Sequence, residues 1–304
     1  MTQWTVNDIP NQTGRSAVVT GTGGLGLEDA LALTRAGAEV IIAGRNPDKG
    51  GEAVARVRRE VPSAVVRFER LDLADLASVT AFGERLRGQA DHLDLLINNA
   101  AVMVPPARVE TKDGFELQLG TNYLGHFALT AHLMSLLRKA PAARIVSLSS
   151  VAARSGAINF DDLNARRRYQ PMPAYGQSKI ACLMFAFELQ RRSEAGGWGV
   201  ASLAAHPGVS RTDLLLNAPG ENSLPRFFRK TFPFLFQPAA QGALPTLFAA
   251  TARDARPGLY YGPNGAAELR GYPAEAKIPP QALDETVARR LWAVSEDLTK
   301  VSFG

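Results

Sequence analysis

The sequence places a tyrosine and a lysine at a spacing that suits proton transfer. Tyr175 and Lys179 lie four positions apart in AYGQSK. If this stretch is helical, the two side chains share one face, a turn apart. A phenol that exchanges a proton with an alcohol or a carbonyl near neutral pH needs its phenolate stabilised by about 4 kcal/mol. A lysine ammonium about 5 Å away supplies on the order of 3 kcal/mol at an effective dielectric constant of about 20. The pair is therefore a candidate acid and base.

A serine hydroxyl that holds the substrate oxygen beside the phenol would complete such a site. Ser149 and Ser150 end the predicted strand ARIVSLSS. Because side chains alternate along a strand, only one of the two can point toward the site. Their position alone does not decide which.

A cluster of glycines marks a second candidate site. In VVTGTGGLGLEDALAL, Gly21, Gly23 and Gly26 fit G-x-G-x-x-G directly after a predicted strand and at the opening of a predicted helix. Glycines at these positions allow a tight turn and let backbone N–H groups approach a pyrophosphate at the positive end of the helix. The alternative is a simple strand-to-helix turn. The strand and helix on either side favour a dinucleotide site.

The end of the second predicted strand indicates which dinucleotide is bound. An acidic residue there would take the ribose hydroxyls of NAD, but IIAGRNPDKGG has no carboxylate at this point. A carboxylate would repel a 2′-phosphate, whereas a guanidinium can grip one in bidentate fashion. Arg45, with Lys49 adding charge, therefore predicts NADP(H) in preference to NAD(H). The alternative is an ordinary surface arginine.

Short apolar runs alternate with longer helical stretches along the chain. This alternation favours parallel strands joined by right-handed crossovers, and near-continuous apolar strands suit a sheet covered on both faces. We therefore expect an α/β fold with a doubly wound, mainly parallel sheet of about seven strands in a single domain spanning the chain. The expected strands lie at 15–21, 38–45, 65–73, 93–101, 143–150, 199–208 and 258–263, and a last helix lies at 282–298.

One segment, Leu214 to Pro238, combines prolines with five phenylalanines. It is either a packed surface connection or a flap over an apolar ligand. Its position after the sixth predicted strand, where such a sheet keeps its pocket, favours a substrate flap at 209–240. The phenylalanines are Phe227, Phe228, Phe232, Phe234 and Phe236.

Composition excludes several classes of protein. The 304 residues carry a formal net charge of +5, but the basic residues are scattered, and RRRY at 166–169 predicts a solvated loop rather than a nucleic-acid site. One cysteine, Cys182, excludes an intrachain disulfide and a cysteine-clustered metal site, and we expect it to be a small core residue. No run of about eighteen apolar residues occurs, which predicts a soluble cytoplasmic protein without a membrane span.

Ordered motifs along nearly the whole chain resemble the short-chain dehydrogenase/reductase family. They are VVTGTGGLG, LDL, INNAA, TNYLGHF, IVSLSS, YGQSK and HPGVSRT. The stretches GAINFDDLN and LWAVSEDL further resemble the branch that contains retinol dehydrogenases, WW-domain oxidoreductases and light-dependent protochlorophyllide reductases. The resemblance implies a Rossmann fold with a nicotinamide cofactor, and a homodimer or homotetramer is compatible with it.

The resemblance also implies roles for catalytic residues. Ser150 positions the substrate oxygen, and Tyr175 is the acid/base. Lys179 orients the ribose and makes the phenol more acidic. Asn122 holds a water that relays protons through Lys179; read without the family, Asn122 is an amide satisfied locally within a helix.

Other positions are implied to contact the cofactor. Asp72 lies by the adenine, Asn98 near the adenosine ribose, and Thr212 beside the carboxamide after the Pro207–Gly208 turn. The expected set is Gly21, Gly23, Gly24, Leu25, Gly26, Arg45, Asp72, Leu73, Asn98, Ala100, Tyr175, Lys179, Pro207, Gly208 and Thr212. No metal is expected.

Two departures from the family pattern bear on the cofactor. The family usually has T-G-x-x-x-G-x-G, but Thr20–Gly21 reaches Gly24 and Gly26 with one residue fewer. Ala101 stands where a glycine is usual, which is tolerable if the backbone there needs no positive φ. We expect the two histidines of these motifs, His126 and His206, to be packed or hydrogen-bonded rather than catalytic.

Together these features predict an NADP(H)-dependent oxidoreductase that transfers hydride between nicotinamide and a carbonyl or alcohol of a largely apolar small molecule. The alternative is a non-catalytic NADP(H)-binding sensor or scaffold. Retention of the serine, tyrosine, lysine and asparagine together favours the enzyme.

Overall fold

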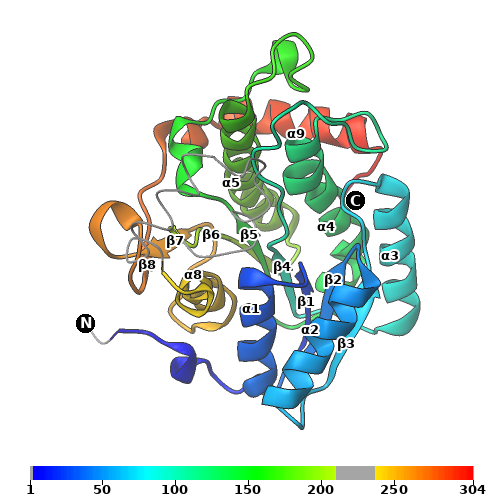
Figure 1. Ribbon diagram of the computed structural model, residues 1–304, viewed down its shortest axis with the longest axis vertical. Helices are drawn as coiled ribbons and strands as arrows, with labels where there is room; N and C mark the ends of the chain where they lie inside the picture. Colours follow the sequence, from blue (N-terminus) through cyan, green and yellow to red (C-terminus); the bar gives the residue numbers. More distant parts are fainter. Residues whose placement is uncertain (1–2, 210–236, 304) are drawn as a thin grey trace.

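The computed structural model describes residues 3–209 and 237–303 and shows one sheet with helices on both faces (Figure 1). The strands are β1 (Ser16–Thr20), β2 (Glu39–Gly44), β3 (Val66–Arg70), β4 (Leu95–Asn98), β5 (Ala143–Leu148), β6 (Val200–Ala205), β7 (Tyr260–Pro263) and β8 (Pro273–Glu275). The α-helices of the described residues are α1 (Gly24–Arg35), α2 (Pro47–Glu60), α3 (Leu76–Gln89), α4 (Gly125–Leu137), α5 (Pro171–Gly196), α8 (Ala239–Thr251) and α9 (Glu285–Thr299). Shorter helices are η1 (Val6–Asp8), the π-helical η2 (Leu119–Leu124), η3 (Val151–Ser155), η4 (Phe160–Asp162), η6 (Ala266–Glu268) and η7 (Pro280–Leu283).

The sheet confirms the doubly wound prediction. Its strand order is β3-β2-β1-β4-β5-β6-β7-β8, and every neighbouring pair is parallel except β7 and β8. The order reverses between β1 and β4, and ligands bind such sheets outside the carboxyl ends of the strands at this switch point. The short antiparallel β8 was not predicted, because three half-exposed or exposed residues make no apolar run.

Side chains that alternate along the strands pack into two separate cores, one on each face of the sheet. On β1, Val18 packs in the core under α3, α4, α5 and α9, whereas Ala17 and Val19 pack on the opposite side under α1, α2 and α8 (Figure 1). This two-sided burial explains why the central strands are apolar at nearly every position.

Helix α5 runs through the first of these cores. It begins with Pro171 in its first turn and ends at Gly196; the next residue, Gly197, caps it in the left-handed conformation that glycine tolerates. All eleven residues of KIACLMFAFEL, 179–189, are buried within the single chain. This apolar stretch is therefore part of a core helix.

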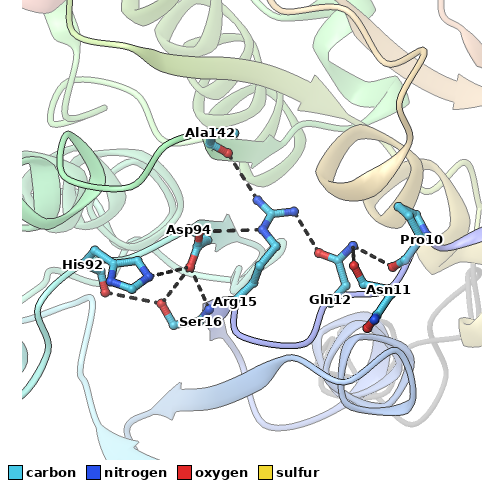
Figure 2. Close-up of polar contacts among 8 residues, drawn as sticks. All are labelled: Pro10, Asn11, Gln12, Arg15, Ser16, His92, Asp94 and Ala142. Carbon is cyan, nitrogen blue, oxygen red and sulfur yellow. Dashed lines mark hydrogen bonds and ion pairs between the residues drawn. The ribbon is translucent and has the colours of Figure 1, made fainter.

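A polar network fixes the amino ends of the central strands, at the edge opposite the switch point (Figure 2). The Asp94 carboxylate accepts hydrogen bonds from the N–H of Ser16 at 2.9 Å and from its hydroxyl at 3.3 Å, and lies 3.3 Å from Nε2 of His92. Arg15 approaches the same carboxylate at 3.7 Å and donates to the carbonyl of Ala142 at 3.2 Å. These contacts join the starts of β1, β4 and β5.

Asp29 of α1 is a buried acid without a partner. Its side chain is fully buried, and neither carboxylate oxygen has a hydrogen bond among the described residues. Burial raises the pKa of Asp29 well above its usual range, and the negative charge of Glu28 adds to the shift. Since the folded-state pKa exceeds the unfolded one, folding favours the protonated acid. The stability that this group contributes is present at low pH and falls as pH rises through the folded-state pKa.

We therefore expect Asp29→Ala to raise the free energy of unfolding at pH 8 by about 1 to 3 kcal/mol. The gain should shrink as pH falls toward about 3, below the unfolded-state pKa, where the wild-type acid is protonated in both states. Urea unfolding at several pH values measures both effects. Glu28→Ala is the matched control, because that carboxylate has a partner in Arg56 at 2.9 Å and its loss should not stabilise the fold. Loss of stability in Asp29→Ala at pH 8 would mean that the buried carboxylate has a native partner.

In the residues that the structure describes, every helix is too short or too polar to cross a membrane.

Candidate active site and cofactor cradle

The predicted tyrosine–lysine pair lies on one face of α5. Both side chains are buried, and Nζ of Lys179 lies 5.8 Å from the centroid of the Tyr175 ring. The ammonium donates a hydrogen bond to the carbonyl of Leu148 at 3.0 Å. Leu148 is the last residue of β5, so this contact fixes the lysine, and with it the tyrosine, at the carboxyl edge of the sheet.

The two serines after β5 differ in what their hydroxyls do. Ser149 is buried and donates its hydroxyl to the carbonyl of Lys179 at 2.8 Å. Ser150 is half-buried at the start of η3, and its hydroxyl oxygen accepts the N–H of Ala152 at 3.2 Å. Among the described residues no acceptor takes the hydroxyl hydrogen of Ser150. Ser150 therefore has a hydroxyl hydrogen available to donate to a substrate, whereas Ser149 links the end of β5 to α5.

Close packing of η3 on α5 depends on a pair of glycines. A Cβ on Gly156 would lie 2.3 Å from the carbonyl oxygen of Gly176, the residue after Tyr175. Backbone atoms cannot give way as a flexible side chain can. Gly156 therefore lets the segment that begins at Ser150 lie directly against the helix that carries Tyr175.

Asn122 lies in the π-helical η2 and links two other elements. Its Oδ1 accepts the N–H of Val102 at 2.7 Å, and its Nδ2 donates to the carbonyl of Val102 and to Oγ of Ser178, both at 2.9 Å. Ser178 precedes Lys179 on α5. The side chain is therefore not satisfied within its own helix; it joins the loop after β4 to the helix of the tyrosine and lysine.

The shortened glycine motif forms a strand–turn–helix corner between β1 and α1. Gly21 and Gly24 adopt φ values of +106° and +53°, which favour glycine. Gly26 lies so close to the end of β4 that a Cβ would be 2.5 Å from Nδ2 of Asn99. Gly23 precedes the helix without a side-chain cap, so no side chain occupies the first N–H groups of α1. Leu25, which follows Gly24, packs against the core under α1.

The end of β4 completes this corner, and Asn99 rather than Asn98 faces it. Asn99 donates its Nδ2 to the carbonyl of Thr20 at 2.7 Å, and the N–H of Ala100 donates to Oγ1 of Thr20 at 2.9 Å. The side chain of Asn98 is buried and donates to Thr130 on α4 at 3.1 Å. The backbone of Ala101 has no positive φ, so the usual glycine is not needed there.

Arg45 follows β2 at the same carboxyl edge and is exposed. Within residues 3–209 and 237–303 its guanidinium makes no hydrogen bond or ion pair, and the ammonium of Lys49, one turn into α2, makes none either. Asn46 caps α2 by accepting the N–H groups of Asp48 and Lys49. Arg45 and Lys49 therefore place positive charge at this edge, and no acidic side chain of the described residues pairs with either of them.

Asp72 and Leu73 form the next loop along this edge. Oδ1 of Asp72 accepts the N–H of Ala74 at 3.0 Å, which holds the loop in a tight turn. The carbonyl of Leu73 lies against the first residue of α4, where a Cβ on Gly125 would be 2.4 Å from that oxygen.

The Pro207–Gly208 turn after β6 is held by a histidine and a glutamate. Nδ1 of buried His206 accepts the N–H of Gly208 at 3.2 Å, and its Nε2 lies 3.0 Å from Oε2 of Glu268. Arg154 of η3 donates to the same carboxylate oxygen at 2.7 Å. The hydrogen bond from His206 lowers the pKa of Glu268 to about 2, with the Arg154 charge contributing. Nothing in the spacing of Arg154 and Glu268 indicated this contact.

Gly208 needs to be glycine, with φ of +63° and a Cβ position 2.4 Å from the carbonyl oxygen of Leu269. Thr212, the five phenylalanines and most of the predicted flap at 209–240 lie outside the described residues. The described part consists of Val209, whose carbonyl accepts the N–H of Gln237 at 3.1 Å, and the residues from Gln237 onward.

The comparisons with known proteins identify the family. Residues 15–221 match the short chain dehydrogenase family. The chain belongs to the short-chain dehydrogenases. It is 40% identical to mouse retinol dehydrogenase 13 over 292 residues, which cover 94% of this chain and 84% of the relative. It is 39% identical to mouse polyprenol dehydrogenase over 302 residues, covering 97% and 87% of the two chains.

A crystal structure of an uncharacterized protein from Mycobacterium paratuberculosis shares the fold of this short-chain dehydrogenase, with a TM-score of 0.83 and 39% identity over the whole of both chains. Short-chain dehydrogenases bind nicotinamide cofactors, and this chain is an oxidoreductase acting on CH–OH or C=O groups. The enzymatic interpretation of the sequence is thereby supported over the non-catalytic one.

Proposed function

We propose that this short-chain dehydrogenase uses NADP(H) to interconvert a carbonyl and an alcohol on a largely apolar small molecule. The observation that carries the proposal is the attachment of α5 to the end of β5. The ammonium of Lys179 donates a hydrogen bond to the carbonyl of Leu148, and the hydroxyl of Ser149 donates one to the carbonyl of Lys179. Tyr175, Lys179 and Ser150 therefore lie at the same carboxyl edge of the sheet. The glycine corner, residues 21–26 after β1, lies at the same edge. In the sheet, β4 separates β1 from β5.

The residues of that corner fit a dinucleotide. The first N–H groups of α1 carry no side-chain cap, and the positive end of its dipole points to the edge. Gly21, Gly23 and Gly24 leave the backbone bare of side chains there. We assign the pyrophosphate to this helix end, and the adenine to the loop of Asp72 and Leu73. When bound, the nicotinamide supplies or accepts the hydride.

The remaining residues move or place the proton. Tyr175 donates its phenolic proton to the substrate oxygen during reduction and takes it back during oxidation. The hydroxyl of Ser150 donates a hydrogen bond to the same oxygen. Lys179 stabilises the phenolate by its charge and binds the ribose, and Asn122 keeps this part of α5 in place through Ser178. In this proposal Asn122 also holds a water that relays protons through Lys179.

Two observations support an apolar substrate and the phosphorylated cofactor. The relatives are named for retinol and polyprenol, both apolar alcohols. The guanidinium of Arg45 stands exposed at the end of β2 with no acidic partner in the described residues, where it can bind a 2′-phosphate.

The two serines test this arrangement. We expect Ser150→Ala to lower kcat/KM for reduction of an apolar aldehyde by about 100-fold, because it removes a donor to the reacting oxygen. Ser149→Ala should chiefly lower the free energy of unfolding, by about 1 kcal/mol, because its hydroxyl bonds backbone. NADPH oxidation with retinaldehyde and a series of aliphatic aldehydes measures the first effect and urea unfolding the second. A larger loss of kcat/KM in Ser149→Ala than in Ser150→Ala would reverse the assignment.

A further inference from the structure

His126 is a buried histidine of α4 whose two ring nitrogens have different, determined roles. Nδ1 lies 2.9 Å from the carbonyl oxygen of Asn122. A carbonyl can only accept, so Nδ1 carries a hydrogen. In the neutral ring Nε2 is then an acceptor, and it lies 2.9 Å from Oγ1 of Thr20. The hydroxyl of Thr20 therefore donates to His126.

Thr20 uses its hydroxyl fully. Oγ1 accepts the N–H groups of Asn99 and Ala100, both at 2.9 Å. Its hydrogen has a good acceptor in Nε2 of His126 and a poorer one in the carbonyl of Ile97 at 3.3 Å. Thr20 is the last residue of β1, immediately before Gly21. The histidine thus sets the direction of the one hydroxyl that holds the ends of β1 and β4 together at the glycine corner.

The other side of the imidazole contacts the proposed active site. The carbonyl of Asn122 accepts from Nδ1 of His126 and from Sγ of Cys182 on α5, at 2.9 and 3.1 Å. The side chain of the same asparagine holds Ser178, next to Lys179. One ring therefore joins the glycine corner to the helix of the tyrosine and lysine.

The ring is suited to this role only when neutral. A charged imidazolium would direct a second N–H at Oγ1 of Thr20, whose acceptor positions are already used. The pKa of His126 is lowered to about 4; burial is the main cause, the hydrogen bond to the Asn122 carbonyl opposes it, and the charge of Lys179 adds to the lowering. The ring stays neutral at physiological pH.

We infer that His126 is a positioning residue that couples dinucleotide binding at the glycine corner to the placement of Asn122 and Lys179. The inference rests on the proposed function, since it requires a cofactor at that corner. A histidine that only packed in the core would affect stability alone, whereas a positioning His126 also affects cofactor binding and turnover.

Two substitutions of His126 separate these roles. His126→Phe keeps the ring shape and loses both nitrogens, whereas His126→Gln keeps an amide oxygen that can accept from Thr20. We expect His126→Phe to raise the dissociation constant of the dinucleotide about tenfold and to lower kcat about tenfold. His126→Gln should recover most of the binding. Ser295→Ala is the control. It removes a buried hydrogen bond between Ser295 of α9 and Tyr123, the neighbour of Asn122 in η2, and it touches no residue of the site.

A double-mutant cycle with Thr20→Val shows whether the effect passes through Thr20. If it does, adding a His126 substitution to Thr20→Val raises the dissociation constant far less than it does in the wild type. Should His126→Phe not fold, the cycle is run with His126→Leu, which also loses both ring nitrogens. Additive effects, or wild-type binding and kcat in a folded His126→Phe, would overturn the inference.

The same titrations keep the two proposals apart. They use whichever of NADPH and NADH the wild type binds more tightly. A wild type that prefers NADH contradicts the proposed cofactor, and the His126 variants are then compared with NADH.

Discussion

Replacing Tyr175 by phenylalanine is expected to lower kcat for carbonyl reduction by about 1000-fold while leaving the dissociation constant of NADPH close to that of the wild type. A positioned general acid contributes about 100- to 10,000-fold to such a reaction. Phenylalanine keeps the buried ring that lies beside Nζ of Lys179 at 5.8 Å and removes only the hydroxyl. Binding at the glycine corner should therefore survive.

Single-turnover NADPH oxidation with a reactive aldehyde measures this effect, and nicotinamide fluorescence measures binding. Tyr261→Phe is the control, because it removes another phenolic hydroxyl, which accepts the N–H of Arg256 at 2.8 Å and has no place in the proposed mechanism. It should keep wild-type turnover. If Tyr175→Phe retained more than about a tenth of wild-type kcat, the tyrosine would not be the acid/base.

The second large effect concerns the choice between the two dinucleotides. Arg45→Ala should weaken NADPH binding about tenfold and leave NADH binding unchanged, because a charge-assisted bidentate bond to the 2′-phosphate is lost. The wild-type preference for NADPH should also decrease as salt concentration rises, since the guanidinium is exposed.

Arg59→Ala provides the matched control. Arg59 is also exposed and lies on the helix that begins beside Arg45, but in its last turn. Its removal changes the net charge equally and should leave both dissociation constants unchanged. An equal loss of NADPH affinity in the two variants would show a general charge effect rather than a phosphate contact.

Local patterns in the sequence predicted the fold. They also predicted that the main site residues lie at the carboxyl edge of the sheet. The seven predicted strands became β1 to β7, and the glycine corner formed despite its missing residue. These features depend on neighbours in the chain, so a single sequence displays them. Strand β8 depends instead on pairing with β7, and its own residues carry no apolar pattern.

The parts that could not be predicted are contacts between distant segments. Position in the strand left Ser149 and Ser150 equivalent, and only the family resemblance favoured Ser150; the acceptor of the Ser149 hydroxyl is the carbonyl of Lys179, thirty residues later. Thr20 and His126 meet across 106 positions, and no spacing rule indicates the pair. Such contacts follow from how α4 and α5 pack on the sheet.

A pair of fluorescence titrations of the wild-type protein with NADPH and NADH tests the proposed function most directly. We expect NADPH to bind at least tenfold more tightly, a difference of about 1.4 kcal/mol. Equal affinities or a preference for NADH would contradict the proposed role of Arg45. Absence of binding by either dinucleotide at submillimolar concentration would show that the shortened glycine corner does not hold a cofactor, and would contradict the proposed function as a whole.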